Sequence, residues 1–390
     1  MDAPESAPEP TPAQPSAEPS APATRPASGA PAAGPLASGP PASGPPGQAS
    51  PPIGGASREA VQRAYASPVR NGLDLPRAQR TRWPEVTVSE IHFRPQRRTL
   101  LPAVLFLATC CSTFWVGAAQ WEPMRPDRMA TWGMVLHTIQ RNWTTGLQYM
   151  CAVVGILVAH EMGHFWQTVK HRIPASYPLC IPVPFNPIGT MGAVIGMDGL
   201  RADRRQIFDI GIGGPLAGLA IAFPVFWYGI SQLNLAGRAQ PEEFQLYLPL
   251  AGQWMLQWAH PDSAWKSAQW APLSQINPFF MAGWVGMLIT GLNMLPISQL
   301  DGGHTIYALF LDRAHRFAKM FVSFAIFYVV VNLDDAVLWV PMLVLVIFMG
   351  IHHPPTANDD VELGPVRWAI GLASLTIPVL CFPLMGLRVA

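Results

Sequence analysis

The chain has few charged residues, no paired cysteines and no long basic run. Of its 390 residues 50% are hydrophobic and only 13% are charged, and the mean hydropathy is +0.22. Because a soluble domain usually carries about 25% charged residues, this balance indicates a membrane protein. The five cysteines form no CxxC pair, which favours free, packed thiols over a disulfide framework or a cysteine metal site. Without a basic run, nucleic acid is not an expected partner.

The amino terminus also lacks the apolar core of a signal peptide. Residues 1–57 contain 16 of the 42 prolines, among alanine, serine and glycine. Such a composition cannot bury a core, so we expect a disordered tail over 1–57. A polar, basic segment over 58–98 follows, and we expect it on the cytoplasmic side.

Seven apolar runs divide the rest of the chain, and most are long enough to cross a bilayer. They lie at about 100–119, 147–168, 207–231, 278–298, 316–331, 335–351 and 366–386. The sequence therefore predicts an all-α polytopic membrane protein of about seven transmembrane helices, with a transmembrane domain over 99–390.

The distribution of arginine and lysine predicts how these spans are oriented. With the amino terminus inside, the short inner segments hold 12 of these residues and the outer segments hold 6. This bias favours a cytoplasmic amino terminus. The acidic residues of the tail argue against an organelle transit peptide, so we expect a bacterial inner membrane.

Residues 177–197, "YPLCIPVPFNPIGTMGAVIGM", are apolar yet contain four prolines, which forbid a regular helix. Irregular backbone at membrane depth must pack on protein or line a wet cavity. We expect a re-entrant loop with a short strand near 189–197, whose edge could pair with an extended peptide. A purely structural plug is the alternative.

The stretch "ILVAHEMGHFWQ" (156–167) places ionisable residues inside an apolar run. His160 and His164 are four residues apart, so a helix presents both rings on one face, about 6 Å apart along its axis. Two imidazoles so placed can bind Zn²⁺, and Glu161, roughly 100° round the helix, is free to act as a general base. Ionisable groups in a span are costly and usually functional. A helix cap or a proton relay in a transporter is the alternative reading.

A catalytic zinc ion requires a third protein ligand and one open position. The segment "GLNMLPISQLDGGH" (291–304) supplies candidates at the inner end of the fourth span. Asp301 is a carboxylate suited to a two-histidine, one-carboxylate site, and His304 is the rival ligand. Asp301 could alternatively be the N-cap of a helix that begins at Gly302.

Three motifs in order, "HEMGH", "GPLAG" and "NMLPISQLDGG", resemble the site-2 protease family of intramembrane zinc metalloproteases, with a similar core over 147–312. The resemblance implies cleavage within or next to transmembrane segments of regulatory proteins, often after a first cut by another protease. Expected partners are therefore a transmembrane protein substrate, membrane lipid and an upstream protease. The implied site consists of zinc ligands His160, His164 and Asp301, general base Glu161, and substrate contacts Asn293, Gly189, Thr190, Met191 and Gly192.

Two other functions stay open. A membrane ion or proton transporter could use the same histidine and aspartate cluster, but it gives no role to a glutamate beside the first histidine. A zinc protease that cuts at the membrane surface would take its third ligand, typically a glutamate, from a distant helix.

Overall fold

A computed structural model describes residues 99–197, 199–233, 244–263, 267–297, 300–336, 339–349 and 353–389. The predicted disordered tail (1–57) and the predicted cytoplasmic segment (58–98) lie outside the described residues.

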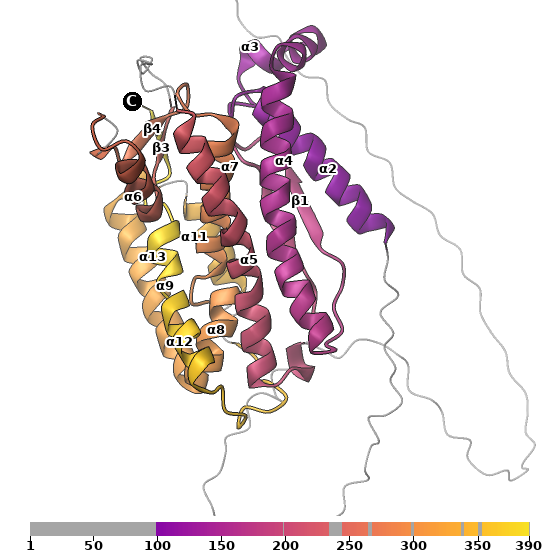
Figure 1. The fold of residues 1–390 in the computed structure, drawn as a ribbon, viewed down its shortest axis with the longest axis vertical. Coiled ribbons are helices and arrows are strands. Elements are labelled where there is room, and N and C mark those ends of the chain that lie inside the picture. The colour runs from indigo at the N-terminus through magenta and orange to yellow at the C-terminus, as the bar shows by residue number, and fades with distance from the viewer. Residues whose placement is uncertain are drawn as a thin grey trace, which may run out of the picture. The chain divides into compact units, whose positions relative to one another are not determined.

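The described residues form mostly helices, with two small sheets (Figure 1). The helices are α2 (Leu100–Ala118), α3 (Pro126–Met129), α4 (Trp132–Lys170), α5 (Arg204–Ser231), α6 (Leu250–Ala259), α7 (Pro278–Asn293), α8 (Asp301–Phe310), α9 (Ala314–Val331), α10 (Leu333–Ala336), α11 (Val340–Met349), α12 (Pro365–Ser374) and α13 (Ile377–Cys381). The strands are β1 (Leu179–Val183), β2 (Gly189–Val194), β3 (Phe244–Tyr247), β4 (Trp270–Pro272) and β5 (Leu387–Val389).

Four helical stretches of the described residues are long and apolar enough to cross a membrane. They are α2, α4, α5 and the continuous stretch Asp301–Val331, which contains α8 and α9. The predicted runs at 278–298, 335–351 and 366–386 also hold helices, but shorter ones, such as the 16 residues of α7. The mostly helical fold is therefore confirmed, with four candidate membrane-spanning stretches among the described residues, and the count of seven spans stays a prediction.

Helix α5 lies between α4 and α7 (Figure 1). The fully buried rings of Phe226 and Phe280 lie 4.7 Å apart between α5 and α7. Two glycines allow this close packing, because a Cβ at Gly229 would overlap the backbone of Phe280 and one at Gly283 would overlap Phe226. Small residues of this kind are typical of helix contacts in membranes.

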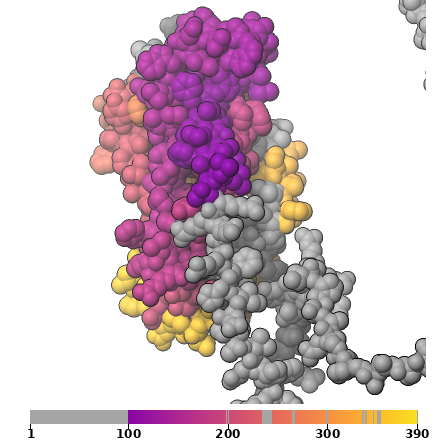
Figure 2. Space-filling model, turned by 90° about the vertical axis from the view of Figure 1, so that its right-hand side faces the viewer, coloured from indigo at the N-terminus to yellow at the C-terminus, as the bar shows by residue number. Residues whose placement is uncertain are grey.

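Helix α2 meets α4 near its C-terminal end and leans away from it toward its N-terminal end, with β1 between them (Figure 1). At the meeting point the helices are in backbone contact. A Cβ at Gly146 would lie 2.7 Å from Phe114 O, and one at Gly117 would lie 2.8 Å from Tyr149 Cβ. Figure 2 shows α2 on the outside of this face, and Leu100 and Leu107 of its apolar surface are exposed.

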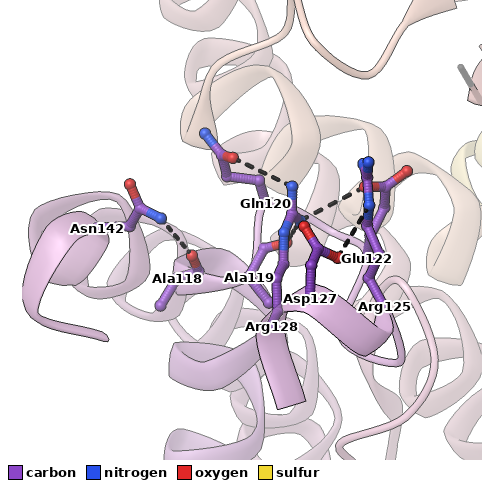
Figure 3. Close-up of polar contacts among 8 residues, drawn as sticks. All are labelled: Ala118, Ala119, Gln120, Glu122, Arg125, Asp127, Arg128 and Asn142. Carbon is purple, nitrogen blue, oxygen red and sulfur yellow. Dashed lines mark hydrogen bonds and ion pairs between the residues drawn. The ribbon is translucent and has the colours of Figure 1, made fainter. Parts of the chain in front are cut away.

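The turn that follows α2 is closed by polar contacts to α3 and α4 (Figure 3). Helix α4 bends at Asn142, whose φ and ψ are −120° and 19°, and the Asn142 amide donates to Ala118 O at 3.0 Å. The Arg128 guanidinium donates to Ala119 O, and Arg125 pairs with Glu122 at 2.7 Å. The bonds from Asn142 and Arg128 reach carbonyls that the end of α2 leaves without helical partners, whereas the Arg125–Glu122 pair joins two side chains.

The proline-rich segment forms a hairpin of β1 and β2. The predicted strand is present over Gly189–Val194, whereas its antiparallel partner β1 was not predicted. The ladder shifts register between Cys180 and Pro182, as expected where a proline cannot donate. The hairpin is anchored from two helices, by Ser112 Oγ to Gly189 O at 2.6 Å and by Tyr149 Oη to Ile188 O at 2.7 Å. Whether the segment re-enters the membrane stays a prediction.

The second sheet has the order β4-β3-β5 and lies next to α6 (Figure 1). Helix α6 exposes Trp254 and Trp258, in keeping with the amphipathic character of tryptophan at membrane interfaces. Trp284 of α7 donates to Tyr247 O of β3 at 2.8 Å, which ties the sheet to the helical core.

Candidate metal centre

His160 and His164 of the HEMGH motif lie on one face of α4, next to α5 and within reach of Asp301 at the start of α8. His160 and His164 are buried, with 2% and 9% of their surface exposed. The Nε2 atoms of both rings lie 3.2 Å from Oδ2 of Asp301. One ligand atom from each of the three residues lies within 4.8 Å of the others, so the group could hold a metal ion.

Asp301 reaches this group because the chain turns sharply after α7. Helix α7 ends at Asn293, and α8 begins at Asp301 itself. A Cβ at Gly302 would overlap the carbonyl of Met294, so the turn needs glycine directly after the aspartate. Gly302 is therefore required by close packing, and the residue before it, Asp301, is the candidate ligand.

Helix α5 provides the space that the two imidazoles occupy. A Cβ at Gly214 would overlap Nε2 of His164, and one at Gly218 would lie 2.9 Å from Nδ1 of His160. These two residues are the first and last of "GPLAG", at the i, i+4 spacing that matches the two histidines. The small residues of α5 thus allow this helix to approach α4 closely beside the two histidines.

The hydrogen bond that holds His164 fits a cation. His164 Nδ1 lies 2.8 Å from the carbonyl of Ile210, which can only accept, so Nδ1 carries the proton. In the neutral ring, the lone pair of Nε2 then faces the Asp301 carboxylate at 3.2 Å, an arrangement that a cation between the two atoms would stabilise. Two imidazoles and one carboxylate are also the donor set of catalytic zinc sites.

Glu161 lies beside the three residues and not among them. It is 5% exposed and forms part of the wall of a cavity of 460 Å³ between α2, α4 and the hairpin. Apart from Glu161 the wall is mostly apolar, and it includes Phe106, Thr109, Leu157, Phe165, Cys180 and Ala193. A carboxylate is thus presented next to the metal-ligand group and to an apolar space.

Comparisons with known proteins agree with this geometry. Residues 148–333 match the model of peptidase family M50. We call residues 148–333 the M50 segment. The match covers His160, His164 and Asp301, and it agrees with the resemblance that the three motifs indicated.

Two plant proteins are similar to the chain. "Probable zinc metalloprotease EGY1, chloroplastic" of Oryza sativa subsp. japonica is 31% identical over 58% of this chain and 39% of its own length. The protein of the same name from Arabidopsis thaliana is 30% identical over 59% of this chain and 42% of its own length. The chain therefore spans about two fifths of the curated relatives it matches. Their chloroplast location gives no support to a bacterial inner membrane.

Asn293, the predicted substrate contact in the M50 segment, lies at the metal-ligand group. Its Nδ2 atom is 3.3 Å from Nε2 of His160. The amide is therefore close enough to contact a peptide that reaches the ligands, and its role in binding substrate stays a prediction.

The four predicted substrate contacts on β2 differ in side-chain exposure and in backbone conformation. Thr190 is buried and used internally, since its Oγ1 donates to Ile181 O at 3.0 Å and accepts from Gly192 N at 3.1 Å. Met191 is 61% exposed, whereas Gly189 and Gly192 have φ angles of 85° and 91° that favour glycine. The strand thus presents Met191, while the other three shape its backbone.

His304, the rival third ligand, lies outside the metal-ligand group. Its Nδ1 atom lies 2.6 Å from Nε2 of His353, whose own Nδ1 lies 2.5 Å from Pro354 O. Burial lowers the pKa of His353 to about 4, so this ring is neutral and cannot donate from Nε2. His304 is thereby held by the segment before α12, and Asp301 reaches the two histidines instead.

Sequence reasoning missed several residues around the M50 site. The Ile210 carbonyl, Asp209, His171 and Arg367 were not predicted, although they form a connected set of polar contacts next to His164. One signal was available, because Asp209 is an ionisable residue in an apolar run.

Proposed function

We propose that this chain is a zinc metalloendopeptidase that hydrolyses peptide bonds within or next to transmembrane segments of membrane-anchored regulatory proteins. The observation that carries the proposal is the group formed by His160, His164 and Asp301 on apolar helices, with Glu161 beside it in the cavity wall. The family of residues 148–333 and the names of the relatives support it.

The site residues have separate roles in this proposal. His160, His164 and Asp301 would hold the zinc ion, which when bound supplies a Lewis acid and an activated water. Glu161 would accept the proton of the attacking water and return it to the leaving amine. The Asn293 amide, 3.3 Å from His160 Nε2, would contact the backbone of the peptide being cut.

The surroundings of Glu161 support an apolar, extended substrate. The cavity lies where α2 leans away from α4, and its mostly apolar wall suits the side chains of a membrane-embedded segment. A helical peptide bond is shielded by its own turn, so the segment must unwind before it can react. Strand β2 pairs with β1 on one edge in its two-stranded sheet, and the other edge could supply replacement hydrogen bonds.

Two variants test the proposal on the full chain in detergent or liposomes. Glu161→Gln should retain stoichiometric zinc and lose cleavage of a transmembrane substrate, whereas Asp301→Ala should lose or weaken the zinc itself. Asp312→Asn, an exposed acidic residue just after α8, is the matched control and should retain both properties. If the Glu161→Gln protein cleaves the substrate at the rate of the parent, the proposed protease function is wrong.

An ion or proton transporter remains the alternative from another class, because buried histidine and aspartate residues can also relay ions. It would be favoured by ion flux in proteoliposomes that depends on Asp301 and persists in Glu161→Gln. The surface-cutting zinc protease is less favoured, since the described residues bring an aspartate to the histidines and no glutamate joins them.

The proposal includes the membrane arrangement expected from the sequence. A transmembrane protease domain over 99–390, with its core at 147–312, would have about seven spans and a re-entrant hairpin. The bacterial inner membrane and the cytoplasmic amino terminus rest only on the tail and on the basic residues. Labelling of single cysteines placed near Arg172 and near Arg128 would test the orientation, since the proposal puts the former inside and the latter outside. Substrate, lipid and an upstream protease are the proposed partners.

A further inference from the structure

A charged network lies at the cytoplasmic end proposed for α4 and α5, one residue away from a contact to the metal centre. Asp209 of α5 is 9% exposed, although it carries a carboxylate in an apolar helix. Arg367 of α12 donates to both of its oxygens, from Nε at 2.8 Å and from a terminal nitrogen at 2.9 Å. His171 Nε2, at the end of α4, lies 3.0 Å from Asp209 Oδ2. One carboxylate therefore joins three helices.

The residue that follows Asp209 determines the orientation of a proposed zinc ligand. The Ile210 carbonyl receives the hydrogen bond of His164 Nδ1 at 2.8 Å. This bond directs the lone pair of His164 Nε2 toward Asp301. A shift or rotation of this turn of α5 would move the carbonyl and change the direction of the ring.

The same turn of α5 packs closely against α4. A Cβ at Gly163 would overlap the Gly213 carbonyl, and a Cβ at Gly214 would overlap the His164 ring. Helices α4 and α5 are thus in backbone contact beside the ligand, so a displacement of this turn would change the contacts around the His164 ring. Metal centres are sensitive to such changes, and loss of a group that orients a ligand typically costs about 10-fold to 100-fold in metal affinity.

We propose that Asp209, held by Arg367 and His171, is a positioning residue of the metal centre. It fixes the turn of α5 whose Ile210 carbonyl orients His164. A buried ion pair is by itself weak evidence for stability, so its position beside this carbonyl is the reason for assigning it this role. Arg367 lies outside residues 148–333, so the C-terminal part of the chain takes part in organising the M50 segment. This inference rests on the proposed zinc site and does not depend on the proposed proteolysis.

The experiment measures zinc affinity of the purified full chain by competition with a chromophoric chelator, together with the visible spectrum of the cobalt-substituted protein. The variants are Asp209→Asn, Arg367→Gln and Arg367→Lys, with Arg388→Gln as the control. Arg388 also makes polar and aromatic contacts, but to Gln245 and Trp270 of the β3–β5 sheet. The Arg367 side chain is 35% exposed, so its variants remain informative if Asp209→Asn does not fold.

We expect Arg367→Gln and Asp209→Asn to weaken zinc binding by about 10-fold to 100-fold and to alter the cobalt spectrum. Arg367→Lys keeps the charge without the two-pronged contact, so its affinity should lie between those of Arg367→Gln and the parent. The control should remain within about twofold of the parent. An Arg367→Gln protein with a lowered melting temperature but the zinc affinity and cobalt spectrum of the parent would overturn the inference.

His164→Ala and a cleavage assay separate this inference from the proposed function. A parent that binds zinc through His164 but cuts no substrate would refute the protease and leave the positioning role in place. If the His164→Ala protein binds zinc as tightly as the parent, the positioning role is overturned.

Discussion

At the scale of the residue, the two nitrogens of His164 have different partners. Nδ1 donates to the Ile210 carbonyl and Nε2 faces Asp301, so the backbone of α5 selects the tautomer that a metal ion requires. The absence of a side chain at Gly214 is equally necessary, because the ring occupies the space where its Cβ would lie. The orientation of the His164 ring thus depends on the Ile210 carbonyl oxygen and on the lack of a Cβ at Gly214.

This dependence predicts the effect of Gly214→Ala. The new methyl group would displace the His164 ring, so we expect zinc affinity to fall by about 10-fold to 100-fold or more and cleavage to be lost. Gly155→Ala is the matched control, because a Cβ there has no atom within 4 Å, and it should bind zinc like the parent. Equal zinc affinity in the Gly214→Ala protein would contradict the packing described for this ring. Chelator competition measures both.

Thr190 carries a second prediction for a single side chain. Thr190→Val preserves shape but removes the hydroxyl that bonds Ile181 O and Gly192 N within the hairpin. We expect cleavage to fall because β2 loses its shape, while zinc stoichiometry stays at the parent value because no ligand is touched. Thr376→Val removes a hydroxyl that bonds only within its own turn, and serves as the control. Loss of zinc from Thr190→Val would contradict the separation between strand and metal centre.

At the scale of the element, α2 is held at one end and open at the other. Its last turns pack on Gly146 of α4 and are tied by Asn142, whereas its first turns border the cavity that contains Glu161. A helix attached in this way could widen the cavity without disturbing the helices that carry the ligands.

Gly146→Ala tests the attachment of α2. A Cβ at this position would lie 2.7 Å from Phe114 O, so the helices must separate, at a cost of roughly 1–3 kcal/mol. We expect a lower melting temperature with parent zinc content. Gly133→Ala near the start of α4, where the nearest atom to a Cβ is 3.9 Å away, should leave the melting temperature unchanged or slightly raised. A Gly146→Ala protein as stable as the parent would argue against tight contact at this end.

At the scale of the whole molecule, the metal centre joins segments that are far apart in the chain. His160 and Asp301 are separated by 141 residues, and Asp209 and Arg367 by 158. Bound zinc would therefore stabilise the packing of α4 against α8 with α5 alongside, since a ligand that binds only the folded protein raises its stability.

Removal of the metal tests this connection. A chelator should lower the melting temperature of the parent and of Glu161→Gln, and added zinc should restore it. At a free zinc concentration about 100 times the dissociation constant, the stabilisation is about 2.7 kcal/mol. Asp301→Ala should show little response to zinc. If neither the chelator nor added zinc changes the melting temperature of the parent, zinc does not stabilise the fold.

The sequence by itself determined the local features of this protein. The i, i+4 spacing of His160 and His164 sets their common face on any helix, the apolar runs require helices, and the prolines before β2 forbid one. Asp301 and His304 were also marked as candidate ligands, since both follow the fourth apolar run. These features depend on neighbours within a few residues, so they can be predicted from a single sequence.

Only the tertiary structure decided which distant groups meet. The choice of Asp301 over His304, the Ile210 carbonyl behind His164, the pairing of β1 with β2 and the contacts of Asp209 with His171 and Arg367 all depend on how the helices pack. That packing is set by side-chain volumes at contacts such as Gly213 and Gly214, where a single methyl group would shift the register. Local periodicity does not depend on such contacts, so it could indicate His160 and His164 as candidate ligands but not the residues that orient them.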